Sequence, residues 1–205
     1  MKIKQLKISN YLEEYNNEEF EDKILDIHFK DITLDLSILE HKEFNGCLFE
    51  NVTFINKGDN LYFIHCEFNN CDFSNTKFNK SKFYITKMSK NKMLGITFTE
   101  TYLDNTIIED SVLKMSGFFD VSFKNVLFKD ALLKESYFDK CSHTELIFDN
   151  CDMTKIEFTN YKLKKIDLSN CNIEGINITI QDIKGAIIDE TQSIHLIKLL
   201  DVEIK

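Results

Sequence analysis

Large apolar residues recur every five residues through most of the chain. From Phe63 to Ile188, 25 of the 26 positions in this series are large and apolar, and His143 is the exception. The position two residues earlier is Ala, Cys, Ser, Thr or Val at 17 of 26 sites. A period of five fits neither the 3.6 of a helix nor the 2 of a flat strand. It indicates a chain that turns a corner every five residues and points one large and one small side chain inward on each side. The departures at the small position include Asn91, Tyr161 and Gln181.

Four such sides close a square coil of 20 residues, so residues 20 apart are expected to stack. Asn-rich corners such as Asn69-Asn70 suit tight turns. The pattern predicts about seven coils, which at roughly 4.8 Å per strand layer make a rod about 35 Å long. One predicted column is a phenylalanine ladder of Phe78, Phe98, Phe118, Phe138 and Phe158.

Upstream of Phe63 the same period continues one residue out of frame. Phe44, Phe49 and Phe54 keep the spacing, so a one-residue slip is expected within residues 55–60. The regular repeat therefore covers residues 44–190.

This pattern resembles the pentapeptide-repeat family, whose consensus is Ala-Asp/Asn-Leu-X-X with Phe common at the centre. Cys66-Glu67-Phe68-Asn69-Asn70 and Cys71-Asp72-Phe73-Ser74-Asn75 are close matches. The resemblance implies an all-β solenoid, the right-handed quadrilateral β-helix, with a short helix and strand at its C-terminal end.

Residues 1–43 are less regular. Ile24, Phe29, Leu34 and Leu39 keep the five-residue spacing, but the segment also alternates as short strands do. Two interpretations stay open: an N-terminal cap, or degenerate first coils. Six acids within residues 13–22 indicate a solvated segment.

The repeat stops after Ile188, and residues 191–205 are expected to form a capping and dimerisation segment. Asp189-Glu190-Thr191 is typical of a helix start, and residues 201–205 read as a strand. The chain here reads Gly185-Ala186-Ile187-Ile188, then Gln192, then Leu196-Ile197-Lys198-Leu199-Leu200. In these residues the segment resembles the C-terminal tail of Qnr-type quinolone-resistance proteins, although Asp201 stands where Gly is expected. In that family the tail builds a two-fold dimer. The resemblance implies a homodimer interface of Ile194, Ile197, Leu200, Val202 and Ile204.

Catalytic and cofactor motifs are lacking in the sequence, so we expect no enzyme, no cofactor and no metal site. The six cysteines all fall at the small inward position, and none forms a CxxC pair. His143 is interpreted as a buried core histidine or a local bulge. No apolar run has membrane-spanning length and no export signal precedes the repeat, so we expect a cytoplasmic protein with reduced cysteines.

The formal charge of −9 argues against direct binding of nucleic acid and favours a basic partner. The charge is uneven along the chain. Residues 61–100 carry a net +3, which comes from a belt of lysines on about one coil. These six residues are Lys77, Lys80, Lys82, Lys87, Lys90 and Lys92.

The resemblance implies a DNA-mimicking protein that binds DNA gyrase or topoisomerase IV and protects it from quinolones. An acidic rod would compete for the positively charged groove that holds duplex DNA. The alternative is a scaffold or self-immunity module that binds another partner and has no topoisomerase role.

Overall fold

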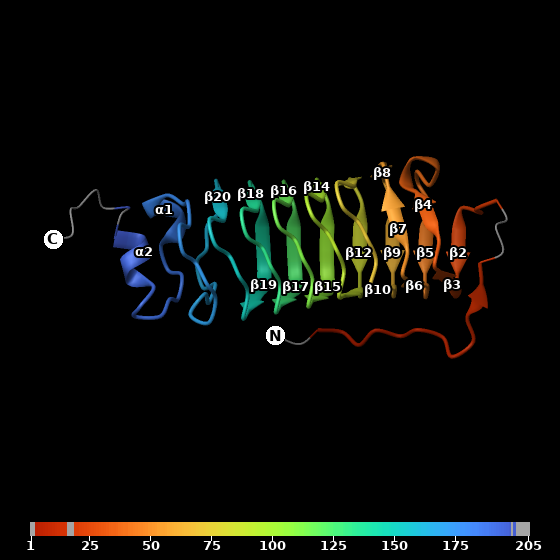
Figure 1. Ribbon diagram of the computed structural model, residues 1–205, viewed down its shortest axis with the longest axis horizontal. Helices are drawn as coiled ribbons and strands as arrows, with labels where there is room; N and C mark the ends of the chain where they lie inside the picture. Colours follow the sequence, from red (N-terminus) through yellow and green to blue (C-terminus); the bar gives the residue numbers. More distant parts are fainter. Residues whose placement is uncertain (1–2, 16–18, 198, 200–205) are drawn as a thin grey trace.

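The structure is a computed structural model that describes residues 3–15, 19–197 and 199. Its coils stack into a rod in which strands of successive coils lie side by side (Figure 1). All strand pairs are parallel, as in β11 (Lys77–Asn79) and β14 (Thr97–Thr99). The predicted all-β solenoid is confirmed.

Four faces make up the rod, numbered here in the order in which the chain meets them from β2 onward. The first face stacks β2 (Lys23–Leu25), β5 (Glu43–Asn45), β9 (Tyr62–Ile64), β12 (Lys82–Tyr84), and the first halves of β15 (Tyr102–Glu109), β17 (Ser122–Lys129) and β19 (Ser142–Asp149). The second face stacks β1 (Glu13–Glu14), β3 (Ile27–Lys30), β6 (Leu48–Glu50), β10 (Glu67–Asn69), β13 (Lys87–Ser89), and the second halves of β15, β17 and β19. The third face holds β4 (Thr33–Asp35) and β7 (Thr53–Ile55), then single bridges from Asp72 to Asn172. The fourth face stacks β8 (Lys57–Asp59), β11, β14, β16 (Gly117–Phe119), β18 (Tyr137–Asp139) and β20 (Glu157–Thr159).

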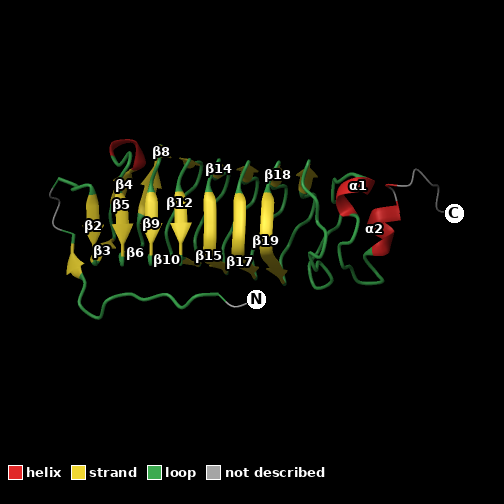
Figure 2. Cartoon of the chain, turned by 180° about the vertical axis from the view of Figure 1, so that it is seen from behind, coloured by secondary structure: helices red, strands yellow, loops and turns green. Residues whose placement is uncertain are grey.

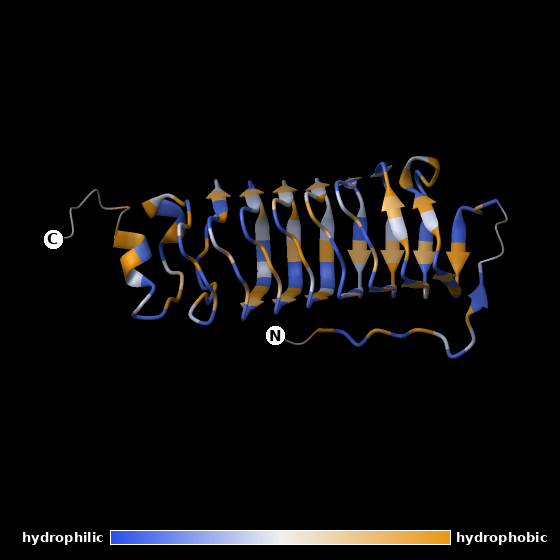
Figure 3. Cartoon of the chain, viewed as in Figure 1, coloured by the Kyte–Doolittle hydropathy of each residue, from blue (hydrophilic) through white to orange (hydrophobic). Residues whose placement is uncertain are grey.

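The core is the interior of the rod, where the large residue of each pentapeptide meets its counterparts from neighbouring coils. Hydrophobic and hydrophilic residues alternate along the strands (Figure 3), and the large apolar residues, such as Phe98 and Phe118, are buried. On the fourth face the rings of Phe98 and Phe118 stack at 5.3 Å and those of Phe118 and Phe138 at 4.4 Å. Each such pair contributes about 0.5–1.5 kcal/mol beyond its buried area.

The corners adopt left-handed backbone conformation. Between Asp26 (φ 53°) and Lys165 (φ 69°), the residue two after a large core residue has positive φ at every corner except Leu36, which begins a 3-10 helix. Asn, Asp and Gly tolerate this conformation best. The preference explains why Asn and Asp occupy so many corners, although Lys and Glu also occur there.

The predicted one-residue slip lies at Gly58. Strand partners across it are 19 residues apart, as in Phe44 and Phe63, whereas Phe83 and Leu103 are the usual 20 apart. Gly58 occupies a large-residue position opposite Phe78. A Cβ at Gly58 would lie 2.5 Å from Cδ1 of Leu61, because Leu61 fills the core space that the missing side chain leaves.

Aromatic side chains cover the N-terminal end of the core. The rings of Tyr15 and Phe20 stack at 5.1 Å, and Tyr15 lies 5.0 Å from Phe29 of the first complete coil. The residues of the 3-10 helix Leu36–Ile38 follow, with Leu36 fully buried. Residues 23–39 thus form a coil of their own.

At the other end, strands give way to turns and two short helices (Figure 2). These are α1 (Ile180–Ile183) and α2 (Ser193–Ile197). The sequence repeat continues to Ile188, but Gln181 takes the place of a small inward residue and the chain forms α1 there instead of a strand. The predicted strand at 201–205 lies outside the described residues.

The N-terminal segment 3–12, called the arm below, runs lengthwise along the rod without forming a strand (Figures 1 and 2). The backbone N–H of Lys4 donates to Oδ1 of Asn105 at 3.0 Å. Its Nζ donates to the Tyr84 hydroxyl at 2.6 Å. The arm therefore lies on the corner between the first and second faces and reaches from the end of the rod to β15.

Candidate interaction surfaces

The inward-facing polar groups are sealed in the core. All six cysteines are buried and unpaired. The thiol of Cys66 donates to the carbonyl of Phe44 at 3.3 Å. Burial raises the pKa of the Cys71 and Cys141 thiols to about 12. Protonated thiols of this kind are poor nucleophiles and poor metal ligands.

His143 is half-buried beside Tyr161. The two rings meet edge-on with centroids 5.4 Å apart. Burial lowers the pKa of His143. A surface groove beside it is lined by Glu145, Lys164 and Lys165. Tyr161 is buried and fills space that a large residue at position 143 would need.

The described residues contain no group of three or more His, Cys, Asp or Glu side chains that could hold a metal ion. Within the same residues, no helix is long and apolar enough to cross a membrane.

The second face and the corner that follows it form the acidic face of the rod. Their outward positions between residues 28 and 190 hold ten acids and four lysines. On the first face and its following corner, seven lysines outnumber five acids. The ten acids are Asp31, Glu50, Glu67, Glu109, Asp110, Asp130, Asp149, Asp167, Asp189 and Glu190.

The acids concentrate on the last five coils of this face. Seven of them lie between residues 109 and 190, against the single lysine Lys129. With each coil rising about 4.8 Å, a net six charges on five coils gives one charge per ~4 Å. One strand of B-DNA carries a charge about every 3.4 Å. This part of one face therefore has a linear charge density close to that of one DNA strand.

Hydrogen bonds fix several of these carboxylates in their charged form. Burial raises the pKa of Glu109, but the hydrogen bonds from Lys87 and Ser89 outweigh it and leave that pKa lowered. Hydrogen bonds from Ser169 lower the pKa of Asp167. These groups are negative at neutral pH.

The lysine belt circles the rod instead of forming a patch. Lys87 pairs with Glu109 at 2.8 Å, Lys92 with Asp72 at 2.9 Å, and Lys80 lies 4.0 Å from Glu100. Each of these partners belongs to a neighbouring coil. The belt therefore balances charge between coils, and it reaches the acidic part of the second face only at its first acid, Glu109, which pairs with Lys87.

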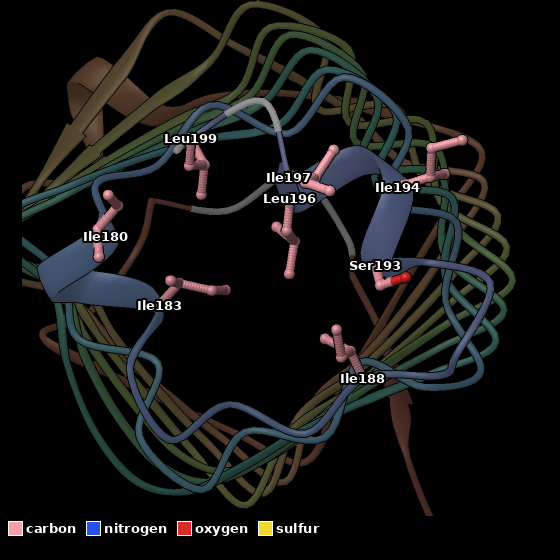
Figure 4. A pocket seen from close by; sticks show the side chains of 8 residues that line it. All are labelled: Ile180, Ile183, Ile188, Ser193, Ile194, Leu196, Ile197 and Leu199. Atoms are coloured by element: carbon pink, nitrogen blue, oxygen red, sulfur yellow. The ribbon is translucent and has the colours of Figure 1, made fainter. Parts of the chain in front are cut away.

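The C-terminal end of the rod is an apolar hollow of about 560 Å³. Ile183, Ile188 and Leu196 point toward it, whereas Ile194 points away (Figure 4). Ile194 is 55% exposed and Ile197 is 36% exposed. Of the predicted dimer residues, Leu200, Val202 and Ile204 lie outside the described residues.

Sequence reasoning missed the arm and the residues that it contacts. Residues 3–12 carry no repeat, and the bonds from Lys4 reach 80 and 101 residues along the chain. One signal was present in the sequence: Ile85 is a β-branched apolar residue at a corner, where side chains point outward.

The stacked coils define a β-solenoid repeat protein. Residues 61–138 match the family model described as "Pentapeptide repeat region", so the chain carries a pentapeptide-repeat region, and the resemblance to that family is confirmed. The search of curated proteins found no match.

Among solved structures, the chain is similar to QnrB1, described as a plasmid-mediated fluoroquinolone resistance protein. The TM-score is 0.41 at 17% identity, over 94% of this chain and 96% of that one. It is also similar to the pentapeptide-repeat protein Rfr23 from the cyanobacterium Cyanothece 51142. That TM-score is 0.29 at 15% identity, over 58% of this chain and 64% of that one. TM-scores below 0.5 do not by themselves establish a common fold.

Proposed function

We propose that the protein is a non-enzymatic DNA mimic that binds DNA gyrase or topoisomerase IV and protects it from quinolones. The observation that carries the proposal is the acidic part of the second face, residues 109–190, with a linear charge density close to that of one DNA strand. A positively charged groove that holds duplex DNA would accept a straight rod with this charge.

Rigidity supports the same function. The acidic residues stand on coils joined by parallel strand pairs, and side-chain bonds such as Asn170 to Asp149, at 2.6 Å, hold neighbouring corners together. A preorganised charge array binds without the entropic cost of ordering flexible side chains.

The proposed functional unit is a homodimer joined at the C-terminal ends. The hollow at that end leaves Ile180 42% exposed in addition to Ile194 and Ile197. A second copy would cover this apolar surface and double the length of the acidic face. Leu200, Val202 and Ile204 complete the proposed interface.

Competition for gyrase tests the docking face. Purified protein should displace a fluorescent duplex from gyrase, measured by fluorescence anisotropy. Reversing two corner charges, Asp110→Lys with Asp130→Lys, should weaken displacement at least tenfold, because it changes the net charge of the acidic part by four. Lysine is native at several corners, including Lys140 with φ 51°, so the fold should tolerate both changes.

The matched control places the same charge change elsewhere. Asp120→Lys with Glu135→Lys alters two exposed corners on other faces and should leave displacement close to that of the unmodified protein. Equal losses in the two variants would show that only net charge matters and would contradict a docking face.

A further inference from the structure

Two corner residues differ from all others in their burial. Among the described non-glycine residues with positive φ, only Ile85 (5% exposed) and Asn105 (2%) are buried. Both belong to the corner on which the arm lies. Met115, also apolar and at φ 56°, sits at an uncovered corner and is 62% exposed.

Ile85 has an unfavourable backbone conformation for its residue type, and its side chain is nevertheless buried. A β-branched residue at φ 54° is disfavoured, and this backbone costs roughly 1–2 kcal/mol for a residue with a side chain. An outward apolar side chain also has nothing to pack on unless another segment covers it. An isoleucine at this position is therefore explained by a segment of chain that packs over its side chain.

The arm is only lightly attached to this corner. Among the described residues, the first backbone-to-backbone bond is that of Glu13 to Asp26, after the arm has ended. Lys4 supplies two hydrogen bonds to the corner, and the apolar side chains of Ile3, Leu6 and Ile8 are half-buried. Release of the arm would break no hydrogen bond of the coil stack.

We propose that the corner formed by His65, Tyr84, Ile85 and Asn105 is a docking track for an extended segment of a partner protein, and that the arm masks it. The segment that fits has apolar side chains interspersed with lysines, as in Ile3-Lys4-Gln5-Leu6-Lys7-Ile8. Oδ1 of Asn105 accepts a backbone N–H, and the Tyr84 ring and hydroxyl accept a lysine. The buried Ile85 offers an apolar surface between them.

Energetics favour a partner protein over a second copy as the occupant. A second copy brings an identical arm, so exchange gains no contact and must compete with a tethered segment at millimolar effective concentration. A partner segment with better contacts displaces the arm and gains net affinity.

The test uses the full chain with its arm weakened by Leu6→Asp and Ile8→Asp. The probe is a fluorescent peptide of residues 3–12 with the native sequence, followed by anisotropy. The peptide should bind this variant at least tenfold more tightly than the unmodified protein, whose own arm occupies the track. Circular dichroism of the variant should match that of the unmodified protein.

Two corner changes in the arm-weakened variant locate the site. Ile85→Asn, which suits the left-handed corner, should weaken peptide binding about tenfold, whereas Met115→Asn should not change it. The proposal would be overturned if the peptide bound the unmodified protein as tightly as the arm-weakened variant. It would also be overturned if Ile85→Asn left the affinity for the peptide unchanged. A second copy as the occupant is tested by sedimentation in the Ile197→Asp background, which removes the proposed C-terminal interface. Dimers of the weakened variant with the chain that keeps its arm would there assign the track to a second copy and would also overturn the proposal.

Discussion

The ring of Tyr161 meets the imidazole of His143 at 79°, with the two centroids 5.4 Å apart. Each residue departs from the repeat, since Tyr161 occupies a small inward position and His143 a large one. Tyr161 is 1% exposed, so its ring fills the core space that a large apolar residue at position 143 would otherwise occupy.

The first prediction is that these two positions are energetically coupled. His143→Phe alone should overpack the core and cost about 1–3 kcal/mol. Tyr161→Thr alone should leave a cavity and cost about 3–5 kcal/mol. The double variant restores the repeat and should be more stable than the sum of the single changes implies, by at least ~1 kcal/mol in urea unfolding. Additive effects would contradict this packing.

Removing the Tyr161 hydroxyl should not destabilise the protein. That oxygen is buried without a hydrogen-bond partner among the described atoms. Tyr161→Phe removes an unsatisfied polar group, so the free energy of unfolding should stay level or rise by about 1 kcal/mol. Tyr137→Phe is a control on an outward side chain. A loss above ~1 kcal/mol in Tyr161→Phe would show that the hydroxyl has a partner.

The slip at Gly58 gives a third prediction. Gly58→Ala places a methyl group against Leu61 and should destabilise the rod by about 1–3 kcal/mol. Leu61→Val in the same chain makes room and should recover part of that loss. Thermal unfolding of the single and double variants measures the recovery. If the double variant unfolds at the same temperature as Gly58→Ala alone, Leu61 does not fill the space left by Gly58.

Much of the fold could be predicted from the sequence because neighbouring contacts repeat at a fixed interval. Phe98 meets Phe118 for the same reason that Phe118 meets Phe138, so one period describes the stack. The arm could not be predicted, since its attachment at Tyr84 and Asn105 follows no period. The acidic face could not be predicted, because acids and lysines are mixed along the sequence and separate only by the face of the rod on which they lie.

Acidification should weaken the rod between pH 7 and pH 5. Burial lowers the pKa of both His65 and His143 below the unfolded value of about 6.5, so protonation of either histidine favours the unfolded state. The contribution of these two histidines to the free energy of unfolding is therefore fully present above the unfolded pKa and is lost as the pH falls below it. His143→Gln should reduce the fall in melting temperature over this range. His41→Gln, at an exposed site, should not; equal slopes in the two variants would contradict the assignment.

Dimerisation through the C-terminal hollow predicts that Ile197→Asp yields monomers in sedimentation. A charge on this apolar surface would be buried without a partner in the dimer. Ile38→Asp is the control, since Ile38 is 67% exposed near the opposite end. If Ile197→Asp still sediments as a dimer, Ile197 is not part of the dimer interface.

The central claim, protection of gyrase by an acidic rod, is tested most directly by a supercoiling assay with ciprofloxacin and a titration of the purified protein. Restored supercoiling at low-micromolar protein or below, lost in Asp110→Lys with Asp130→Lys and kept in Asp120→Lys with Glu135→Lys, is the predicted result. No rescue by the unmodified protein, even with gyrase from its own source organism, would contradict the proposed function.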